Sequence, residues 1–320
     1  MKKLVLLFAT AMVAFNVSAR DHISIVGSST VFPFASVVSE AHGKNGFKSP
    51  LIESTGSGGG MKLFCAGLGP KHPDITNASR AIKSSEKKLC ASNGVTPIER
   101  LVGYDGIAFA NSRDGKKFSL TKEEIYLAIA MKVPAGKTGQ GYNKDQMIDN
   151  PFTSWNQINS KLPNQKISIL VPPPTSGTRD AFVELVMHKT CKSYGMPKKG
   201  ANGYKQQCSQ VREDGRAIIV GENDNLIIAK LKNDSSRFGI FGFSFLDQNM
   251  EKVQGAIING KEANFDNIAD GSYPISRPLF YYIKKEHMDS IPGINEYDKL
   301  FAEMAQPEGR LEDLGLIPVM

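Results

Sequence analysis

The chain has 320 residues, of which 41% are hydrophobic and 22% are charged, and its formal net charge is +7. This composition excludes a disordered chain, and the length exceeds what one ordinary core fills, so we expect two domains. The basic excess is modest and spread along the sequence, without an arginine-rich or aromatic-interleaved run, so a nucleic-acid partner is not expected.

Residues 1–19 have the features of a secretory signal peptide. Lys2 and Lys3 precede an apolar run from Leu4 to Val17, and small residues lead up to Ala19. The run is too short to span a membrane. We therefore expect cleavage near Ala19 and a soluble mature chain that is periplasmic or secreted.

The first part of the mature chain repeats the order strand, loop, helix three times. Strands are expected over residues 22–27, 51–54 and 74–78, each followed by a helical pattern. Parallel strands bring their carboxyl-end loops to one edge of a sheet, where ligands bind. All three loops carry hydroxyl residues and one carries an arginine, which together predict a shared oxyanion site: Ser28-Ser29-Thr30, Gly56-Ser57-Gly58 and Ser79-Arg80.

The middle of the chain has a different texture. Two strands, over 98–102 and 107–110, are expected to flank Gly103-Tyr104-Asp105-Gly106. Thr121 and Glu124 then form a capping box for a helix. Residues 133–152 are rich in glycine, proline and lysine, and this composition predicts a long loop.

A second hydroxyl-rich loop, Thr175-Ser176-Gly177-Thr178-Arg179-Asp180, follows a strand expected over 167–171. The apolar residues behind it have helical spacing, so the hydroxyls fall at the start of a helix, where backbone N–H groups have no partner within the helix. Serine and threonine are also ordinary helix caps. The matching loops in the first part of the chain favour an anion site in a cleft between two α/β lobes.

The chain has four cysteines, Cys65, Cys90, Cys191 and Cys208. An even number in an exported chain indicates disulfides, and three pairings are possible. The nearest-neighbour pairing, Cys65–Cys90 with Cys191–Cys208, closes two short loops and is our prediction, although the sequence does not decide among the three. No CxxC or CxxH pair exists, so no metal site is expected.

Catalytic motifs are not found in the sequence. Gly136-Lys137-Thr138 lacks the leading glycine of a phosphate-binding loop, because Met131 stands at that position. Gly56-Ser57-Gly58 does not have the spacing of a nucleophile elbow. We therefore expect a binding protein that has no catalytic residues and needs no cofactor.

Six short motifs occur in the order seen in phosphate-binding proteins of Pst-type ABC transporters. They are Ser28-Ser29-Thr30-Val31-Phe32-Pro33, Thr55-Gly56-Ser57-Gly58-Gly59, Ala78-Ser79-Arg80, Asp105-Gly106-Ile107-Ala108, Ser176-Gly177-Thr178-Arg179 and Pro274-Ile275-Ser276-Arg277-Pro278-Leu279. The chain resembles this family over essentially its whole mature length. The resemblance implies an α/β fold, namely a two-lobed periplasmic binding protein of type II with two hinge crossings and mixed, mostly parallel sheets flanked by helices.

The same resemblance implies how the chain is divided and what it binds. Lobe I is expected to comprise residues 20–107 and 272–320, and lobe II residues 108–271, with hinges near Gly103–Gly106 and Gly271–Tyr273. The implied ligand is the phosphate anion, delivered by a monomeric receptor to an inner-membrane ABC permease.

Ligand contacts are implied from both lobes. They are Ser29, Thr30, Val31, Phe32, Ser57, Ser79, Arg80, Asp105, Ser176, Gly177, Thr178, Arg179 and Asp180. Some family members have an arginine where this chain has Pro172, so Arg179 is expected to supply that charge.

The second departure from the family is Arg80, which stands where the best-known branch has an aspartate that accepts the proton of hydrogen phosphate. A buried carboxylate beside a dianion costs energy unless a proton lies between them. Asp105 and Asp180 are the candidates to replace it, and either of them could instead orient an arginine. Two alternatives stay open: a receptor for sulfate, molybdate or an organic phosphate, and a secreted phosphatase or adhesin built on the same fold.

Overall fold

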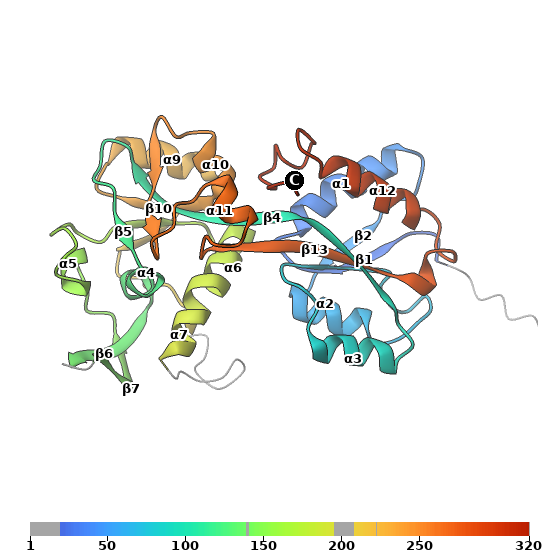
Figure 1. The fold of residues 1–320 in the computed structure, drawn as a ribbon, viewed down its shortest axis with the longest axis horizontal. Coiled ribbons are helices and arrows are strands. Elements are labelled where there is room, and N and C mark those ends of the chain that lie inside the picture. The colour runs from blue at the N-terminus through green and yellow to red at the C-terminus, as the bar shows by residue number, and fades with distance from the viewer. Residues whose placement is uncertain (1–19, 139–140, 195–207, 222, 320) are drawn as a thin grey trace, which may run out of the picture.

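The computed structural model describes residues 20–138, 141–194, 208–221 and 223–319, which form two α/β lobes joined by two long strands (Figure 1). The predicted signal peptide, residues 1–19, lies outside the described residues. Within them, no helix combines the length and the apolar character needed to cross a bilayer.

The sheet of lobe I has the strand order β2-β1-β3-β13-β4. β1 (Ser24–Gly27) pairs in parallel with β2 (Leu51–Ser54) and β3 (Ile75–Ala78), as the repeated strand, loop and helix order predicted. β13 (Ser276–Lys284) and the first half of β4 (Pro97–Ser112) add antiparallel strands. The loops after β1, β2 and β3 therefore leave the sheet at the same edge.

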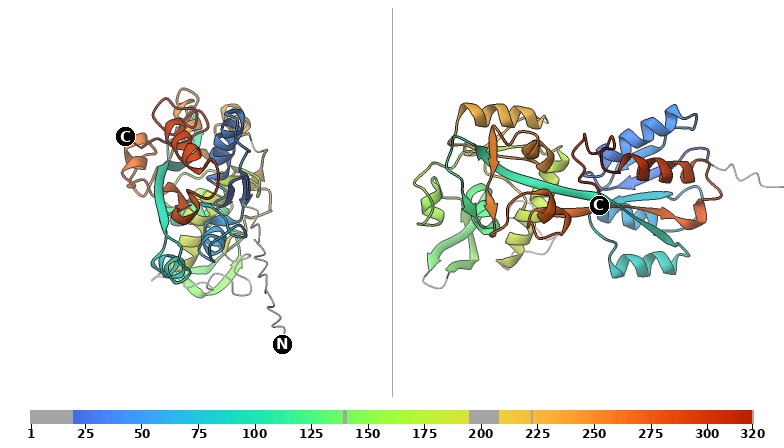
Figure 2. Two further views of the ribbon diagram at one scale, coloured as in Figure 1. Left: turned by 90° about the vertical axis from the view of Figure 1, so that its right-hand side faces the viewer. Right: turned by 45° about the horizontal axis from the view of Figure 1, so that its top comes forward.

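Helices cover both faces of this sheet (Figures 1 and 2). α1 (Phe32–Lys44) packs with α12 (Ile294–Met304) on one face, and α2 (Gly56–Phe64) packs with α3 (Ser84–Ser92) on the other. Each face of the sheet has its own hydrophobic core, and alternate residues of β13 point into them. Tyr281 lies in the core beneath α1 and α12, and Phe280 and Tyr282 lie in the core beneath α2 and α3.

Lobe II is built on a sheet of order β4-β10-β8-β9, in which β11 also pairs with β4. β10 (Phe238–Gly242) is antiparallel to β4 and parallel to β8 (Ile169–Val171), which in turn is parallel to β9 (Ala217–Ile219). The remaining described elements are β5 (Ser119–Leu120), α4 (Lys122–Ile129), β6 (Lys132–Thr138), β7 (Gly141–Asp149), α5 (Trp155–Ile158), α6 (Gly177–Phe182), η1 (Val183–His188), α7 (Lys189–Ser193), α9 (Asp224–Asn233), α10 (Phe243–Asp247), β11 (Val253–Gly255), β12 (Ile257–Ile258), α11 (Phe265–Ala269) and, in lobe I, η2 (Lys285–His287).

The two strands predicted on either side of Gly103–Gly106 are one continuous strand, β4, so that prediction is wrong. The glycines do not interrupt the strand because β13 pairs along it: Ser276 lies opposite Gly106, and Arg277 lies opposite Asp105. β4 and β13 thus run side by side from one lobe to the other (Figure 1). The lobe boundaries at 107/108 and 271/272 stay a prediction.

The long loop predicted over 133–152 is also wrong, because β6 and β7 form an antiparallel pair there. Irregularities in the register next to Pro134 and Ala135 let the pair accommodate a proline. An ion pair between Lys132 and Asp149, 2.7 Å long, links the two strands.

Both predicted disulfides are present. Cys65, directly after α2, is bonded to Cys90 of α3, and Cys191 of α7 is bonded to Cys208. Closing loops of this length stabilises a fold by roughly 3 kcal/mol in the chain-entropy model.

Candidate functional site

The first loop at the edge of lobe I is organised by Ser28. Its hydroxyl oxygen accepts hydrogen bonds from the N–H groups of Thr30 (3.2 Å) and Val31 (3.4 Å), and its carbonyl accepts one from Phe32 (3.1 Å). Val31 is buried in the core of lobe I, and Phe32 begins α1. The loop therefore presents Ser29 and the Thr30 side chain to the cleft.

The second and third loops meet through their serines. Ser57, in the first turn of α2, accepts a hydrogen bond from the N–H of Ser79 (3.0 Å), and the two hydroxyls lie 3.1 Å apart. α2 approaches β1 so closely that a Cβ on Gly60 would lie 2.5 Å from the Cα of Gly27. Glycine at position 60 is therefore required to place the start of α2 beside the loop after β1.

Arg80 extends the third loop towards α3. Its guanidinium makes a bidentate pair with Glu86, with N–O distances of 2.7 and 2.9 Å. Burial is the largest single influence on the pKa of Glu86 and would raise it, but the hydrogen bonds from Arg80 and from the Lys83 backbone, together with the charges of both residues, outweigh burial and lower that pKa. Arg80 is thus held at the cleft as a positively charged group.

The helix predicted after Thr178 is present, and its apolar residues Ala181, Phe182, Leu185 and Val186 are buried. It continues as three consecutive segments, α6, η1 and α7, of which η1 is a π-helix. Turns of this kind are rare and are frequently found at functional sites.

The start of α6 contacts the first loop of lobe I. A Cβ on Gly177 would lie 3.4 Å from the carbonyl oxygen of Ser29 and 3.5 Å from the Cα of Thr30. One turn further along the helix, Asp180 accepts a hydrogen bond from the Ser29 hydroxyl (2.7 Å). The loops of the two lobes, predicted to face each other, therefore do meet.

Arg179 points away from this contact. Its guanidinium is buried and donates to the carbonyl oxygen of Pro172 at 3.0 Å, and burial lowers its pKa. Among the described residues, Arg179 does not line either of the two interlobe cavities described below, and neither do Val31 and Phe32.

The guanidinium in the cleft belongs to Arg277, which lies in the sixth sequence motif and is not among the predicted ligand contacts. Nε donates to Asp105 (3.3 Å), Nη1 donates to Glu184 (2.9 Å), and Nη2 donates to the Thr30 hydroxyl. Arg277 thus joins lobe I, lobe II and β4. The sequence feature that could have identified Arg277 is that it is the one charged residue in the extended segment Pro274–Leu279.

Asp105 lies directly opposite Arg277 in the β4–β13 pair. Its side chain is largely buried, and burial raises its pKa in spite of the neighbouring guanidinium. The environment of the Asp105 carboxylate therefore favours its holding or sharing a proton.

Two polar cavities lie between the lobes and meet at Thr30. The Arg80 cavity, about 340 Å³, contains the predicted residues Ser29, Thr30, Ser57, Ser79, Arg80 and Asp180 and also Lys83, Glu184, His188 and Arg277. The Asp105 cavity, about 250 Å³, contains Thr30, Asp105, Ser176, Gly177 and Thr178. The structure therefore gathers ten of the thirteen predicted contacts around one position.

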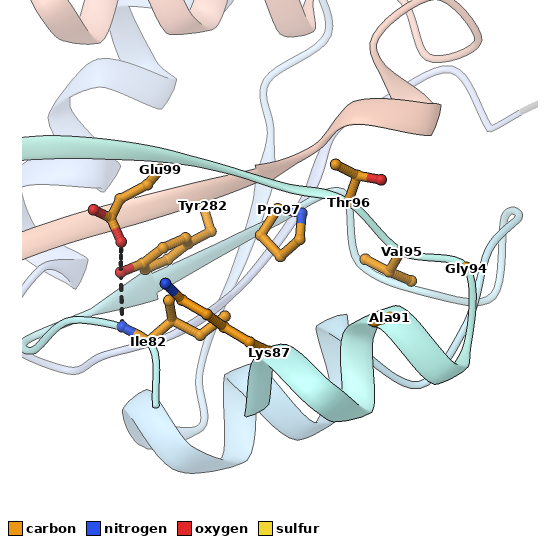
Figure 3. Close-up of a pocket in the computed structure, with 9 residues that line it drawn as sticks. All are labelled: Ile82, Lys87, Ala91, Gly94, Val95, Thr96, Pro97, Glu99 and Tyr282. Atoms are coloured by element: carbon orange, nitrogen blue, oxygen red, sulfur yellow. Dashed lines mark hydrogen bonds between the residues drawn. The ribbon is translucent and has the colours of Figure 1, made fainter. Parts of the chain in front are cut away.

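A larger cavity, about 530 Å³, lies in lobe I between α3 and the strands (Figure 3). Its polar groups are used internally: the Tyr282 hydroxyl donates to Glu99 (2.7 Å) and accepts from the N–H of Ile82 (2.9 Å). Lys87 reaches across it from α3 (Figure 3). This cavity receives nothing from lobe II.

Two α/β lobes, two shared strands and a polar cleft that gathers cations and hydroxyls define a binding protein of the periplasmic type. A family model described as a PBP superfamily domain matches residues 16–303, and the chain belongs to this family.

Relatives and solved structures agree with this assignment. The chain is 28% identical over 274 residues to Protein SphX of Synechococcus elongatus, covering 83% of this chain and 69% of the relative. It is 29% identical over 300 residues to Phosphate-binding protein PstS of Staphylococcus epidermidis, covering 91% and 77%. The fold matches the crystal structure of a possible phosphate binding protein from Planctomyces limnophilus with a TM-score of 0.73 at 24% identity, covering 95% and 94%.

Proposed function

We propose that this protein is a periplasmic receptor that binds inorganic phosphate between its lobes and delivers it to an ABC permease. The observation that carries the proposal is that the two cavities share Thr30, whose hydroxyl accepts a hydrogen bond from the buried guanidinium of Arg277. Hydroxyls of lobe I line the Arg80 cavity with Arg277, and Ser176 and Thr178 of lobe II line the Asp105 cavity. The names of the relatives, which include phosphate-binding proteins, support the choice of anion.

We place the anion at this junction, within reach of Arg277, Ser57 and the Ser176–Thr178 loop. Charge-assisted bonds from Arg277 and Arg80 would supply strength, and neutral hydroxyl and N–H donors would supply geometry. Because such an anion contacts both lobes only when they are together, its binding favours the closed arrangement. A closed surface is what a permease would recognise, and the receptor would act as a monomer.

Asp105 is our candidate for the carboxylate that reads the proton of hydrogen phosphate. It lines the same cavity as the Ser176–Thr178 loop, whereas Asp180 accepts the Ser29 hydroxyl. An aspartate at this position would repel sulfate, which has no proton to share. Asp105→Asn should narrow the preference for phosphate over sulfate more than Asp180→Asn does, as measured by the ratio of the two dissociation constants.

Isothermal titration of the purified mature protein with phosphate, sulfate and molybdate tests the function itself. We expect clear binding of phosphate and much weaker binding of the other two anions. If sulfate or molybdate gives a clear binding signal and phosphate gives none, the proposed ligand is wrong and that other anion takes its place. The same titration followed by light scattering checks that the receptor is monomeric.

A further inference from the structure

The cleft contains a carboxylate that is bonded to the same guanidinium on which we place the anion. Glu184, in η1, accepts a hydrogen bond from Nη1 of Arg277 at 2.9 Å. Glu184 also lines the Arg80 cavity, together with Ser57, Ser79 and Arg277 itself. An anion that enters this cavity therefore meets a negative charge already placed on its strongest candidate partner.

The geometry of Arg277 makes this meeting a competition. A guanidinium grips a tetrahedral anion best through two parallel N–H groups on one edge. Nε has a single hydrogen, which is directed to Asp105, so the edge formed by Nε and Nη2 is blocked. The remaining edge is formed by Nη1 and Nη2, and Nη1 is the atom bonded to Glu184.

Glu184 is also the anionic partner that can be released most easily. The Asp105 side chain is 17% exposed and is fixed opposite Arg277 by strand pairing, whereas the Glu184 side chain is 50% exposed. A half-exposed carboxylate on a long side chain can turn into water at little cost in solvation. Releasing Asp105 would instead require the β4–β13 pair to open.

We propose that Glu184 is an internal counter-anion, which the bound anion displaces from Arg277 and which sets a charge threshold for binding. This inference rests on the proposed function of the cleft. A monoanion only replaces one negative charge by another, so it gains little from Arg277. A dianion brings a second charge to the same edge and gains more. Glu184 thereby lowers the affinity for every anion by the same cost of displacement, and monoanions such as chloride and formate gain too little from Arg277 to exceed that cost.

The test compares wild-type protein with Glu184→Gln by isothermal titration with phosphate, sulfate and formate, at low and at high chloride. We expect the variant to bind phosphate about three- to tenfold more tightly than wild type. We also expect formate binding to become measurable and chloride to compete more strongly. Unchanged or weaker phosphate binding would overturn the proposal, since weaker binding would mean that Glu184 supports the anion.

Two matched variants separate this role from a general effect of charge. Glu262 is a glutamate of lobe II that lies outside the cleft and has a similar exposure, 55%. It is paired with Lys117 at an N–O distance of 2.6 Å, and Glu262→Gln should leave the affinity for phosphate unchanged. Asp180→Asn removes one charge from the same cavity without touching Arg277. An affinity gain in Asp180→Asn as large as in Glu184→Gln would refute the specific pairing with Arg277.

The wild-type titrations distinguish failure of this inference from failure of the proposed function. Phosphate binding by wild type with no gain in Glu184→Gln removes the counter-anion role and leaves the receptor intact. Binding of sulfate or molybdate alone removes phosphate as the ligand, and the Glu184→Gln comparison is then read with that anion. Failure of wild type to bind phosphate, sulfate or molybdate, together with failure of Glu184→Gln to bind phosphate or sulfate, would overturn both.

Discussion

Strand β13 carries a buried cation near each end, and the two differ in what surrounds them. At the far end, Lys284 is fully buried, donates to the carbonyl oxygen of Gly67 (2.6 Å) and lies 5.2 Å from the centre of the Phe64 ring. At the cleft end, the Arg277 side chain is 5% exposed and borders a cavity of about 340 Å³.

The counter-charge at the far end is sealed in place. Asp74 is fully buried and accepts hydrogen bonds from Arg20, from the N–H of Ser24 (2.7 Å) and from Nδ1 of His287 (2.7 Å). Nε2 of His287 accepts from the N–H of Gly69 (3.0 Å), which assigns the ring proton to Nδ1. Arg277 instead shares its charge with Glu184, which is half exposed. We therefore expect Lys284 and its buried partners to contribute to stability, and Arg277, whose partner Glu184 faces a cavity, to contribute to binding.

Asp74→Ala should have the largest effect, and it should fall on stability alone. Three donors lose their acceptor inside lobe I, and breaking a buried pair in this way costs about 3–5 kcal/mol. Urea denaturation measures the loss, with Asp313→Ala at an exposed aspartate as the control. If Asp74→Ala were as stable as wild type but had lost affinity for the anion, the assignment of stability to the Lys284 end of β13 and of binding to the Arg277 end would be contradicted.

Lys284→Met should reveal a dependence of stability on pH. Burial lowers the pKa of Lys284 from 10.5 to about 8, and attraction to Asp74 offsets only part of that shift. Between these pH values the unfolded chain binds the proton and the folded chain does not, so the wild type gains stability as pH rises and carries the full penalty below pH 8. The stability difference between wild type and variant should change by roughly 2–3 kcal/mol across this window. A difference that is flat from pH 7.5 to 10 would show that Lys284 is not held at a lowered pKa.

Arg277→Met should weaken phosphate binding, since it removes a charged donor worth about 1.5–3 kcal/mol, or roughly ten- to a hundredfold in affinity. Arg179→Met should cause a smaller loss of affinity, because that guanidinium is bonded to Pro172. Isothermal titration of both variants, with Arg113→Met at an exposed arginine of lobe II as the control, makes the comparison. A greater loss in Arg179→Met would assign the anion charge to Arg179.

Ser57→Ala should have the smallest effect. The variant removes one neutral donor from the cleft, which costs about 0.5–1.5 kcal/mol in binding, and it also leaves the N–H of Ser79 without its acceptor. Ser92→Ala, at an exposed serine in α3, is the control. Phosphate affinity equal to that of wild type would place the anion away from the start of α2.

The parts of the fold that follow from local pattern could be predicted. The parallel arrangement of β1, β2 and β3 follows from the repeated strand, loop and helix order. The capping box also predicts α4, where the N–H of Glu124 bonds to the Thr121 hydroxyl at 3.1 Å. The two wrong predictions concern segments whose structure depends on pairing with another strand. Pairing with β13 keeps Gly103–Gly106 within the continuous strand β4, and pairing with β7 makes the glycine- and proline-rich segment before it the strand β6.

The same distinction holds for the site. Ser57, Ser79 and Ser176 could be predicted from the local sequence, because hydroxyl residues are favoured at strand ends and helix starts. Arg277 does not, since only the pairing of β13 with β4 brings residue 277 opposite Asp105 and beneath Thr30. The positive charge assigned to Arg179 from its neighbours in sequence faces Pro172 instead.

β4 and β13 form a two-stranded ribbon, and any rotation of one lobe against the other has to twist both strands as a unit. Arg277 and Asp105 are paired within this ribbon, so we expect them to lie near the axis about which the lobes turn. A charge on the axis moves least during such a rotation. We therefore expect the positive charge of Arg277 to stay within reach of an arriving anion both when the lobes are together and when they are apart.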